Sequence, residues 1–511
     1  MTNYISDLVR REDFDPDAFN LIDAGPGAGK TTFINERLHE LFPEVSYENI
    51  LMAESRSLTA SMLDKDDDSN FSKLRYGDIA RIRKLKGLPE LSAGSVHEGI
   101  TVATYDKLVD MVAHNNGEGD ILAGVDIVVL DETHCLYTDV FISNIKAVSV
   151  WLKGLFSPSR TKRPLVIGLS ATPDCFTELN KVEQNFPIHR ILDRKLVKYR
   201  AKHLICGAIN DIPDICKNRF KGKTIIMCEK LDDCYMLARL LGNAAVVCSA
   251  RNEHITKEMI RIRRYIEENA SLPDTHFNEE LNKWEPLKYL IMTATGREGY
   301  NFRAMRNDGV LTDDDIQNVI VCFTDPMSIV QFAGRPRYDI PNLMVAMNPF
   351  GNRGVNNNSF RKYQCDQRHE YLSFVRGDDR KGSPWFKLIS PFLEENVTDV
   401  EVLESVGRSK HSLQNEMKKM RSDSLVPEFI RAISVYISKG DSEVRVYVGD
   451  GDAAIVRAAK SINIFRNNED CTFKRIKILL ERNGYSVQWD RERIWSSSGN
   501  VYKPYYVIKE E

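Results

Sequence analysis

The sequence predicts an α/β protein with two consecutive parallel-sheet domains and a mixed, mainly helical C-terminal region. Short β-branched runs alternate with helical patterns over the first part of the chain, to about residue 200. The same alternation then repeats to about residue 350, and charged helical segments follow. Short apolar runs between turn or charged residues are typical of strands buried on both faces of a parallel sheet, and the helical patterns between them indicate βαβ units.

The strand-like runs fall into two series of five. The first series is Phe19–Asp23, Ile50–Ala53, Ile100–Thr104, Ile127–Leu130 and Leu165–Leu169. The second series is Lys223–Cys228, Ala245–Cys248, Leu287–Met292, Val319–Phe323 and Leu343–Met347. The basic segment Ile191–His203 shows no strong strand pattern and is expected to connect the two series. We therefore divide the chain into residues 1–195, 196–375 and 376–511.

The end of the chain has its own pattern, a helix-like run followed by two strand-like runs near residues 471–509. This order is compatible with a winged-helix-like module. Its aromatic residues could stack on bases or wedge a duplex, and they could equally form a core. They are Trp489, Trp495, Tyr502, Tyr505 and Tyr506.

Composition excludes several classes of protein. The 511 residues are 42% hydrophobic and 28% charged, with a net charge of −3, so no global basic field indicates nucleic acid, although a local groove remains compatible with it. The ten cysteines form no Cys-x-x-Cys pair, which favours buried thiols in a reducing compartment. The start of the chain has no signal-peptide core, and no apolar run reaches the length of a membrane span. We expect a cytoplasmic protein without membrane contact.

The stretch IDAGPGAGKTT, residues 22–32, predicts a phosphate-binding loop between a strand and a helix. Glycines let backbone N–H groups turn toward phosphates, and the helix start adds a partial positive charge. Lys30 is expected to reach the β- and γ-phosphates, and Thr31 to ligate Mg²⁺. The nucleotide-binding residues expected here are Ala24, Gly25, Pro26, Gly27, Ala28, Gly29, Lys30, Thr31 and Thr32.

A second apolar strand ends in two adjacent carboxylates within VDIVVLDETH, residues 125–134. Asp131 is expected to hold Mg²⁺, and Glu132 to act as the general base that polarises the attacking water. Alone, such a pair is usually a solvated turn. After a phosphate-binding loop at this distance, the catalytic interpretation is the better one.

Later motifs resemble those of superfamily 2 DExH-box helicases and translocases. Asp131 to His134 is similar to the DExH box, and GLSATP, residues 168–173, to the Ser-Ala-Thr motif, with Ser170 and Thr172 as coupling residues. TATGREGYNF, residues 293–302, is similar to motif V, with Thr293 and the nucleotide-site residue Gly299 at the family spacing. QFAGRPR, residues 331–337, is similar to motif VI.

The resemblance covers roughly residues 15–350 and implies two RecA-like domains with ATP in the cleft between them. It implies that Gln331 communicates with His134, and that Arg335 reaches the γ-phosphate as an arginine finger. The family's second arginine would stand at position 338, which is Tyr338, and Arg337 stands one place early. Arg337 is therefore either a second finger or a surface charge. The family's adenine-reading glutamine motif has no counterpart in residues 1–23, so other triphosphates are also compatible.

The resemblance also implies a nucleic-acid track. Ser55 and Arg56 would face phosphates from motif Ia, Thr104 from motif Ic, and Thr293 and Arg297 from the second domain, without reading base sequence. Each of these residues could equally cap a helix or remain solvated. The basic patches Arg81–Gly87 and Lys257–Tyr265 could line the track or simply be solvated helix faces.

The sequence thus predicts an ATP-dependent helicase or translocase that uses Mg²⁺ and acts on single-stranded or partly duplex nucleic acid. DNA and RNA remain alternatives, and protein partners could bind the C-terminal domain. Two other classes stay open, an ATP-dependent nucleic-acid clamp and a P-loop NTPase switch without unwinding. The compact length and short front resemble viral or mobile-element helicases.

Overall fold

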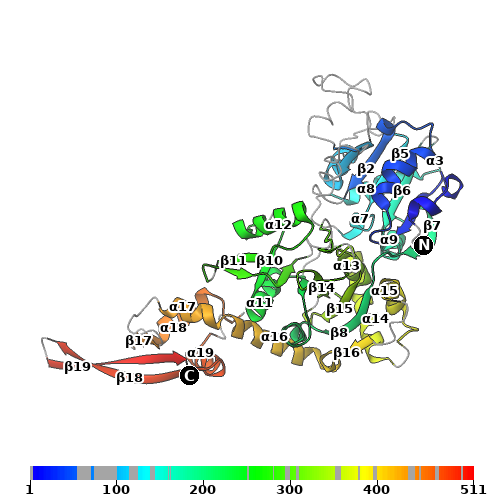
Figure 1. The fold of residues 1–511 in the computed structure, drawn as a ribbon. Coiled ribbons are helices and arrows are strands. Elements are labelled where there is room, and N and C mark those ends of the chain that lie inside the picture. Colours follow the sequence, from blue (N-terminus) through cyan, green and yellow to red (C-terminus); the bar gives the residue numbers. More distant parts are fainter. Residues whose placement is uncertain are drawn as a thin grey trace, which may run out of the picture.

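The computed structural model shows two α/β domains and a smaller C-terminal unit (Figure 1). It describes residues 4–510 apart from 55–70, 74–99, 114–124, 139–143, 159, 161–162, 250–251, 280, 294–299, 307–309, 351–357, 378–379, 395–399, 435–442, 448–450, 466–470 and 497–498. In Figure 1 the first domain lies at the upper right, the second in the middle, and the C-terminal unit at the lower left. The first two units thus meet directly, whereas the third adjoins only the second.

The first domain contains a seven-stranded sheet in the order β3-β4-β2-β5-β6-β1-β7, with all pairs parallel. Its strands are β1 Phe19–Ala24, β2 Ile50–Glu54, β3 Phe71–Lys73, β4 Ile100–Thr104, β5 Ile127–Asp131, β6 Leu165–Ser170 and β7 Ile188–Leu196. Its helices are α1 Ile5–Leu8, η1 Arg11–Asp13, α2 Lys30–Thr32, η2 Phe33–Arg37, α3 Leu38–Leu41, η3 Tyr47–Asn49, α6 Tyr105–Ala113, α7 Cys135–Thr138, α8 Lys146–Leu155 and α9 Pro173–Glu183. The continuous helical segment α2–η2–α3 contains one π-helical stretch.

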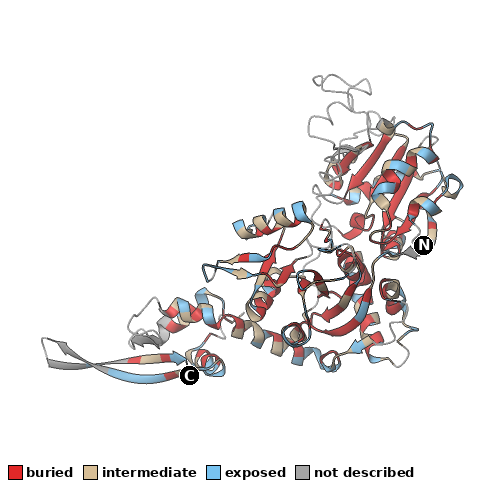
Figure 2. Ribbon diagram, viewed as in Figure 1, coloured by how far each residue is buried: buried red, intermediate tan, exposed pale blue. Residues whose placement is uncertain are grey.

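Helices cover both faces of this sheet, which explains why its strands are apolar throughout. The segment α2–η2–α3 packs on one face together with α1, and α6, α7, α8 and α9 pack on the other. All six residues of β1 are buried (Figure 2).

The second domain repeats this architecture with the strand order β10-β13-β9-β14-β15-β8-β16, again all parallel. Its sheet strands are β8 Ala201–Ala208, β9 Lys223–Met227, β10 Ala244–Val247, β13 Tyr289–Met292, β14 Ile316–Val321, β15 Ile340–Met347 and β16 Val400–Val402, and a separate hairpin is formed by β11 Thr275–Asn278 and β12 Lys283–Pro286. Its helices are η4 Ile209–Asp211, α10 Ile212–Asn218, α11 Leu231–Leu241, α12 Lys257–Asn269, α13 Pro326–Ala333, α14 Asn358–Arg376, α15 Pro384–Ile389, η6 Ser390–Phe392 and η7 Glu404–Gly407.

The fold class expected from the sequence is confirmed, and every run in the two strand series contains a strand of the structure, with ends shifted by at most a few residues. The short edge strands β3 and β16 were not expected. β16 lies beyond residue 376, where the sequence-based division begins the third domain, and it pairs with β8 of the second sheet.

The segment Ile191–His203 contains the connection between the two sheets, but the expectation that it lacks strands was wrong, because most of it is strand. β7 continues to Leu196 and β8 begins at Ala201, so only residues 197–200 connect the two sheets. β7 is an edge strand that pairs on one side only, with β1. An edge strand tolerates charged residues that a central strand would exclude, which hid its pattern in the sequence.

Helix α14 links the two α/β domains. Near its start, Phe360 and Tyr363 pack into the core of the first domain, and Ser359 donates a hydrogen bond to Glu183 of α9. Further along the helix, Tyr371 and Phe374 pack into the core of the second domain. A single helix therefore contacts both domains and depends on their relative position.

The C-terminal unit begins after α16 Lys410–Ser424, which packs along the second domain. Its helices are α17 Val426–Ser434, α18 Gly451–Ser461 and α19 Phe473–Arg482, and its strands are β17 Glu443–Tyr447, β18 Tyr485–Ser496 and β19 Gly499–Glu510. The strands form an antiparallel sheet in the order β17-β19-β18. The unit has a core of its own, separate from the cores of the two larger domains.

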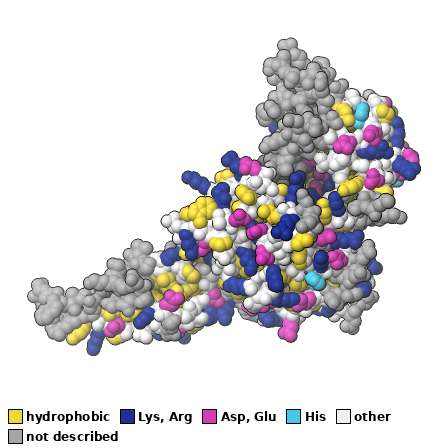
Figure 3. Space-filling view, viewed as in Figure 1, with side chains coloured by type: hydrophobic (Ala, Val, Ile, Leu, Met, Phe, Trp, Pro, Cys, Tyr) yellow, Lys and Arg dark blue, Asp and Glu magenta, His cyan; other side chains and the backbone are white. Residues whose placement is uncertain are grey.

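All ten cysteines are free, and all of them except Cys365 are buried, as expected for structural thiols. None of the helices in the described part of the chain is both long enough and apolar enough to cross a bilayer. Figure 3 shows Lys and Arg intermixed with Asp and Glu over the described surface, in keeping with the small net charge.

Candidate active site

The phosphate-binding loop lies between β1 and α2, as the sequence predicts. Gly27 and Gly29 have φ values of +78° and +84°, a left-handed backbone that disfavours other residues. A side chain at either position would also meet an aromatic ring, Tyr199 at Gly27 and Tyr4 at Gly29. Two tyrosines from distant parts of the chain therefore flank the loop at these glycines.

The carboxylate turn follows β5, next to the loop. Asp131 ends the strand, and Glu132 has a φ of +50°, which is uncommon for a residue with a side chain. The turn is held by hydrogen bonds from Thr133 N to Leu169 O, 3.1 Å, and from Cys135 N to Glu132 O, 2.9 Å. Backbone strain of this kind clusters at functional sites, where the surrounding structure imposes it.

Lys30 connects the loop with both carboxylates. Its Nζ lies 2.9 Å from Oε1 of Glu132 and 3.6 Å from Oδ1 of Asp131. Burial lowers the pKa of Lys30, but the two carboxylates outweigh burial and leave that pKa raised. Burial raises the pKa of Glu132, but Lys30 and His134 outweigh it and leave that pKa lowered. Glu132 is therefore ionised at neutral pH, as a general base must be.

The second domain reaches the same carboxylate from α13. Asp325 caps this helix by accepting a hydrogen bond from Ser328 N, 2.8 Å. Near the other end of the helix, Gln331 is completely buried and its Nε2 donates to Oε2 of Glu132 at 2.7 Å. One carboxylate is thus held by Lys30 from one domain and by Gln331 from the other.

His134 lies in this cluster as well. Its side chain is fully buried, and its Nδ1 lies 3.6 Å from Oε2 of Glu132, the same oxygen that Gln331 contacts. Gln331 and His134 therefore meet at Glu132. The communication between these two residues that the family resemblance implies stays a prediction, and Glu132 is the group through which it would pass.

Arg335 follows α13 and is almost completely buried. Its guanidinium donates to the backbone oxygen of Gln331 at 2.7 Å, to Oε1 of Gln331 at 3.1 Å and to the backbone oxygen of Tyr300 at 3.3 Å. Its charge contributes to the lowered pKa of Glu132. Arg335 is thus positioned in the cleft between the domains.

Arg337 lies on the same short extended segment. Arg337 N donates to Phe302 O at 2.8 Å, Phe302 N donates to Arg335 O at 2.9 Å, and Phe302 and Pro336 form a parallel bridge. The guanidinium of Arg337 donates to the backbone oxygen of Gly334 at 3.3 Å and to Oδ1 of Asn301 at 2.5 Å. Burial, then Arg335, lowers the pKa of Arg337 to about 10.

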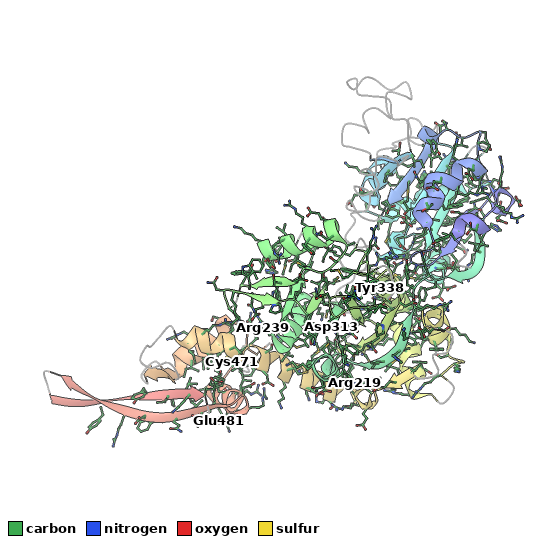
Figure 4. The ribbon with its side chains drawn as sticks, viewed as in Figure 1. Arg219, Arg239, Asp313, Tyr338, Cys471 and Glu481 are labelled. Atoms are coloured by element: carbon green, nitrogen blue, oxygen red, sulfur yellow. The ribbon has the colours of Figure 1, made fainter. Side chains whose placement is uncertain are left out.

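Tyr338, at the position of the family's second arginine, has a structural contact instead. Its hydroxyl accepts a hydrogen bond from Ile316 N at 2.9 Å, and its ring packs against the core of the second domain. Figure 4 labels Tyr338 at the level of the contact between the two domains.

Asp131 and Thr31 are the oxygen donors that the sequence predicts for Mg²⁺. Asp131 Oδ1 is buried and makes no hydrogen bond within the described part of the chain, and its ion pair with Lys30 is long at 3.6 Å. The Thr31 side chain is exposed at the start of α2. A carboxylate and a hydroxyl beside a phosphate-binding loop fit Mg²⁺, which prefers oxygen ligands and retains several waters. The described residues contain no cluster of three or more His, Cys, Asp or Glu that could hold a metal by itself.

Two residues of this site were missed by the sequence analysis. Glu54 ends β2 and is buried, and burial, then Asp131 and Glu132, raises its pKa well above the usual value. Tyr105 donates its hydroxyl proton to Asp131 O at 2.9 Å. Their positions in the sequence could have identified them, because both directly follow predicted strands whose carboxyl ends meet at one edge of the sheet.

The Ser-Ala-Thr motif lies at the end of β6. Thr172 N donates to Oγ of Ser170 at 3.0 Å, and both residues are buried. Asp23 of β1 is the register partner of Ser170, so this motif lies beside the strand that leads into the phosphate-binding loop.

The nucleic-acid residues are only partly described. Thr104 ends β4 and Thr293 follows β13, so each lies at the carboxyl end of its sheet. Ser55, Arg56, Arg297, Gly299 and the patch 81–87 lie outside the described residues. The patch Lys257–Tyr265 forms most of α12, where Arg261 pairs with Glu258 at 2.7 Å and lies over Trp284.

Comparison with known families gives one match, which lies in the first domain. Residues 12–181 match the family model of the DEAD/DEAH box helicases. This stretch contains the phosphate-binding loop, the carboxylate turn and the Ser-Ala-Thr motif, and it confirms the resemblance to superfamily 2 helicases. No curated protein matches the chain.

Several solved helicase structures resemble the chain at low identity. They include S. cerevisiae Dbp5 bound to RNA and ADP BeF3, at 12% identity over 80% of this chain and 91% of that chain, with a TM-score of 0.43. Mss116p bound to ssRNA and AMP-PNP is 13% identical over 94% of this chain and 90% of that chain, with a TM-score of 0.46. The DUF1998 helicase MrfA bound to DNA and AMPPNP is 13% identical over 69% of this chain and 48% of that chain, with a TM-score of 0.40. Likeness at this level says nothing about the substrate of this chain.

Proposed function

We propose that this protein is a nucleic-acid-stimulated ATPase that moves along or unwinds nucleic acid. One observation carries the proposal: a single partly buried carboxylate, Glu132, is contacted by Lys30 of the first domain and by Gln331 of the second. A site built in this way is complete only when the domains are closed. Hydrolysis can therefore be coupled to a domain movement.

The roles of the side chains follow from their positions. Glu132, ionised and held at two oxygens, takes the proton of the attacking water. Lys30 is paired with Asp131 and Glu132 and would exchange these partners for the phosphates of ATP. Arg335 and Arg337 supply positive charge from the second domain, where the transferring phosphoryl group develops negative charge.

Mg²⁺ would be held by Thr31 and Asp131. When bound, it neutralises developing charge on the phosphate oxygens. The residues of this chain position the phosphate groups and exclude water from the closed cleft. Glu132 accepts the proton.

Nucleic acid would lie across the carboxyl ends of both sheets, near Thr104 of the first domain and Thr293 of the second. A strand held by both domains favours their closed arrangement, and closure brings Gln331 and Arg335 to Glu132. This linkage explains why nucleic acid should stimulate hydrolysis. We further propose a cytoplasmic location, in keeping with ten free thiols.

The experiment measures phosphate release from ATP with and without single-stranded DNA and single-stranded RNA. Stimulation by either one supports the proposal, and equal rates with and without both contradict it in favour of a P-loop switch. A strand-displacement assay then separates a motor from an ATP-dependent clamp. Parallel assays with GTP, CTP and UTP define the base preference.

A further inference from the structure

The C-terminal unit contributes no residue to the ATPase site described above, and its elements have an order of their own. Its elements follow the order helix α17, strand β17, helices α18 and α19, and strands β18 and β19. β19 lies in the middle of the sheet, paired with β17 on one side and with β18 on the other. Three helices against a three-stranded sheet whose last two strands form a hairpin is the arrangement of a winged helix, a variant of the helix-turn-helix unit.

This unit folds around its own core and is attached to the second domain. Its core contains Phe429 of α17, Ile455 of α18, and Ile476 and Leu479 of α19. Glu428 of α17 pairs with Arg239 of α11 at 3.2 Å, and next to it Arg421 of α16 pairs with Asp232 of α11 at 3.0 Å. Figure 4 labels Arg239 at this junction.

Helix α16 completes the attachment. The carboxylate of Asp423 accepts hydrogen bonds from Arg482 Nε and Asn483 Nδ2, both at 2.9 Å. Arg482 at the end of α19 is therefore used to hold the unit in place. Lys474 and Arg475 lie at the opposite end of this helix.

The unit, residues 425–510, contains fourteen Lys and Arg against eleven Asp and Glu, and its excess of positive charge lies in its last part. Residues 471–510 contain eight Lys and Arg against four Asp and Glu, whereas the full chain has a net charge of −3. Lys474 and Arg475 lie exposed on the first turn of α19, and Ile478 is exposed one turn further along. Their spacing places all three on one side of the helix.

The hairpin β18–β19 adds exposed aromatic side chains. Trp489 is 58% exposed and Tyr502 is 55% exposed, and the guanidinium of Arg491 lies 5.1 Å from the centre of the Tyr502 ring. By contrast, Tyr505 is buried and Tyr506 packs on Phe473, so both belong to the core. The side chain of Trp495 lies outside the described residues.

We propose that residues 425–510 form a winged-helix module that binds the double-stranded DNA part of the substrate, with α19 as its recognition helix and the hairpin β18–β19 as its wing. The proposal rests on the proposed function and adds a duplex-binding site to it. Exposed cations on one helix face match the phosphates that border the major groove, which admits an α-helix in B-form DNA. The major groove of A-form RNA is too deep and narrow for such a helix.

The position of the module supports a separate role in substrate binding. In Figure 1 the hairpin points away from both α/β domains, at the opposite end of the molecule from the first domain. The module therefore contacts the substrate outside the cleft in which ATP is hydrolysed. Charge changes on α19 should alter duplex binding and leave the chemistry intact.

The experiment compares the full chain with the variant Lys474→Glu/Arg475→Glu. Binding is measured for single-stranded DNA, for a DNA duplex with a single-stranded overhang, and for the matched RNA duplex, each at several salt concentrations. The matched control is Lys418→Glu/Lys419→Glu, which makes the same charge change on the exposed side of α16.

Relative to wild type, the α19 variant should bind the DNA duplex substrate roughly tenfold or more weakly, with a salt slope smaller by about two. Its binding of single-stranded DNA and its ATPase rate with single-stranded DNA should stay unchanged, and the α16 control should behave like wild type. Trp489→Ala should reduce strand displacement without changing that ATPase rate. These results together would support the proposal that residues 425–510 bind duplex DNA.

Three results would overturn the proposal. One is unchanged duplex binding in the α19 variant, and another is an equal loss in the α16 control, which would indicate a general charge effect. The third is an RNA duplex bound better than the DNA duplex through the same residues. Failure of the proposed function itself looks different, because wild type would then show no ATPase stimulation by any nucleic acid.

Discussion

The two α/β domains share an architecture but supply opposite halves of the candidate active site. The first domain contributes Lys30 from the start of α2, Asp131 from the end of β5 and Glu132 from the turn that follows β5. The second contributes the amide of Gln331 and the cations Arg335 and Arg337, from a helix and a short extended segment. Neither half alone contains both a base and an arginine finger.

The two domains differ in the backbone conformation that holds their functional residues. The first domain holds its base in an unfavourable left-handed turn, fixed by backbone hydrogen bonds to the neighbouring strand. The second holds its cations in ordinary backbone, through hydrogen bonds from Arg335 to Gln331 and Tyr300. The first half is thus preorganised, and the second is brought to it by domain closure.

The largest effect is expected for Glu132→Gln, which removes the base and keeps the size of the side chain. Hydrolysis should fall by roughly 10²–10⁴-fold, while ATP binding stays close to wild type. Single-turnover phosphate release and equilibrium nucleotide binding measure the two quantities. Lys30→Ala provides the contrast, since it should lose nucleotide binding itself. Near-normal turnover in Glu132→Gln would refute the assignment of the base.

Arg335→Ala is expected to reduce stimulated turnover by roughly 10³-fold, as for arginine fingers delivered across a domain boundary. Because the charges of Arg335 and Glu132 both act on Arg337, Arg337→Ala should also be severe. Tyr338→Phe is the control for the neighbouring position and should affect stability more than turnover, since its hydroxyl accepts a hydrogen bond from Ile316 N. Steady-state kinetics with saturating nucleic acid measure all three. Full activity in Arg337→Ala would show that only one arginine acts.

Gly334→Ala tests the closed contact between the halves. A Cβ at Gly334 would lie 2.2 Å from Cγ of Pro26 in the phosphate-binding loop, so one partner must shift. Stimulated turnover should fall by about tenfold or more, because a cost of closure of about 1.4 kcal/mol is already a factor of ten. The control is Gly154→Ala on α8, where a Cβ meets nothing within 4 Å. Equal behaviour of the two variants would argue against the closed contact.

The smallest effect is expected at the helix that links the domains. Ser359→Ala removes the hydrogen bond from α14 to Glu183 and should weaken closure by about 1 kcal/mol, roughly fivefold in an equilibrium constant. The nucleic-acid concentration needed for half-maximal ATPase stimulation should rise accordingly. Ser390→Ala is the control, because the Ser390 hydroxyl donates locally, to Lys387 O. An unchanged half-saturation point in Ser359→Ala would remove α14 from the coupling.

The catalytic half in the first domain could be predicted well from sequence, because the function of its loop and turn depends on residues adjacent in the chain. Glycines with positive φ, Lys30, and the carboxylates after β5 all lie where the motifs indicate. The position of Arg337 could not be predicted, because it depends on a bridge between Pro336 and Phe302 rather than on spacing alone.

Other features of the structure could not be predicted from the sequence for related reasons. Glu54 was missed because only folding brings the end of β2 beside the end of β5. The end of β7 was taken as part of a connector because charged residues on an edge strand resemble a loop. The link made by α14 depends on packing against two cores, which a single helical pattern does not reveal.

The central claim is that both domains build one active site, and a double-mutant cycle between Glu132→Gln and Arg335→Ala tests it most directly. Phosphate release is measured in single turnovers with single-stranded nucleic acid for wild type, both single variants and the double variant. Residues that act as a unit are grossly non-additive, so the double variant should be about as slow as the slower single variant. A double variant slowed by the product of the two individual factors would show that the residues act independently and would contradict the account.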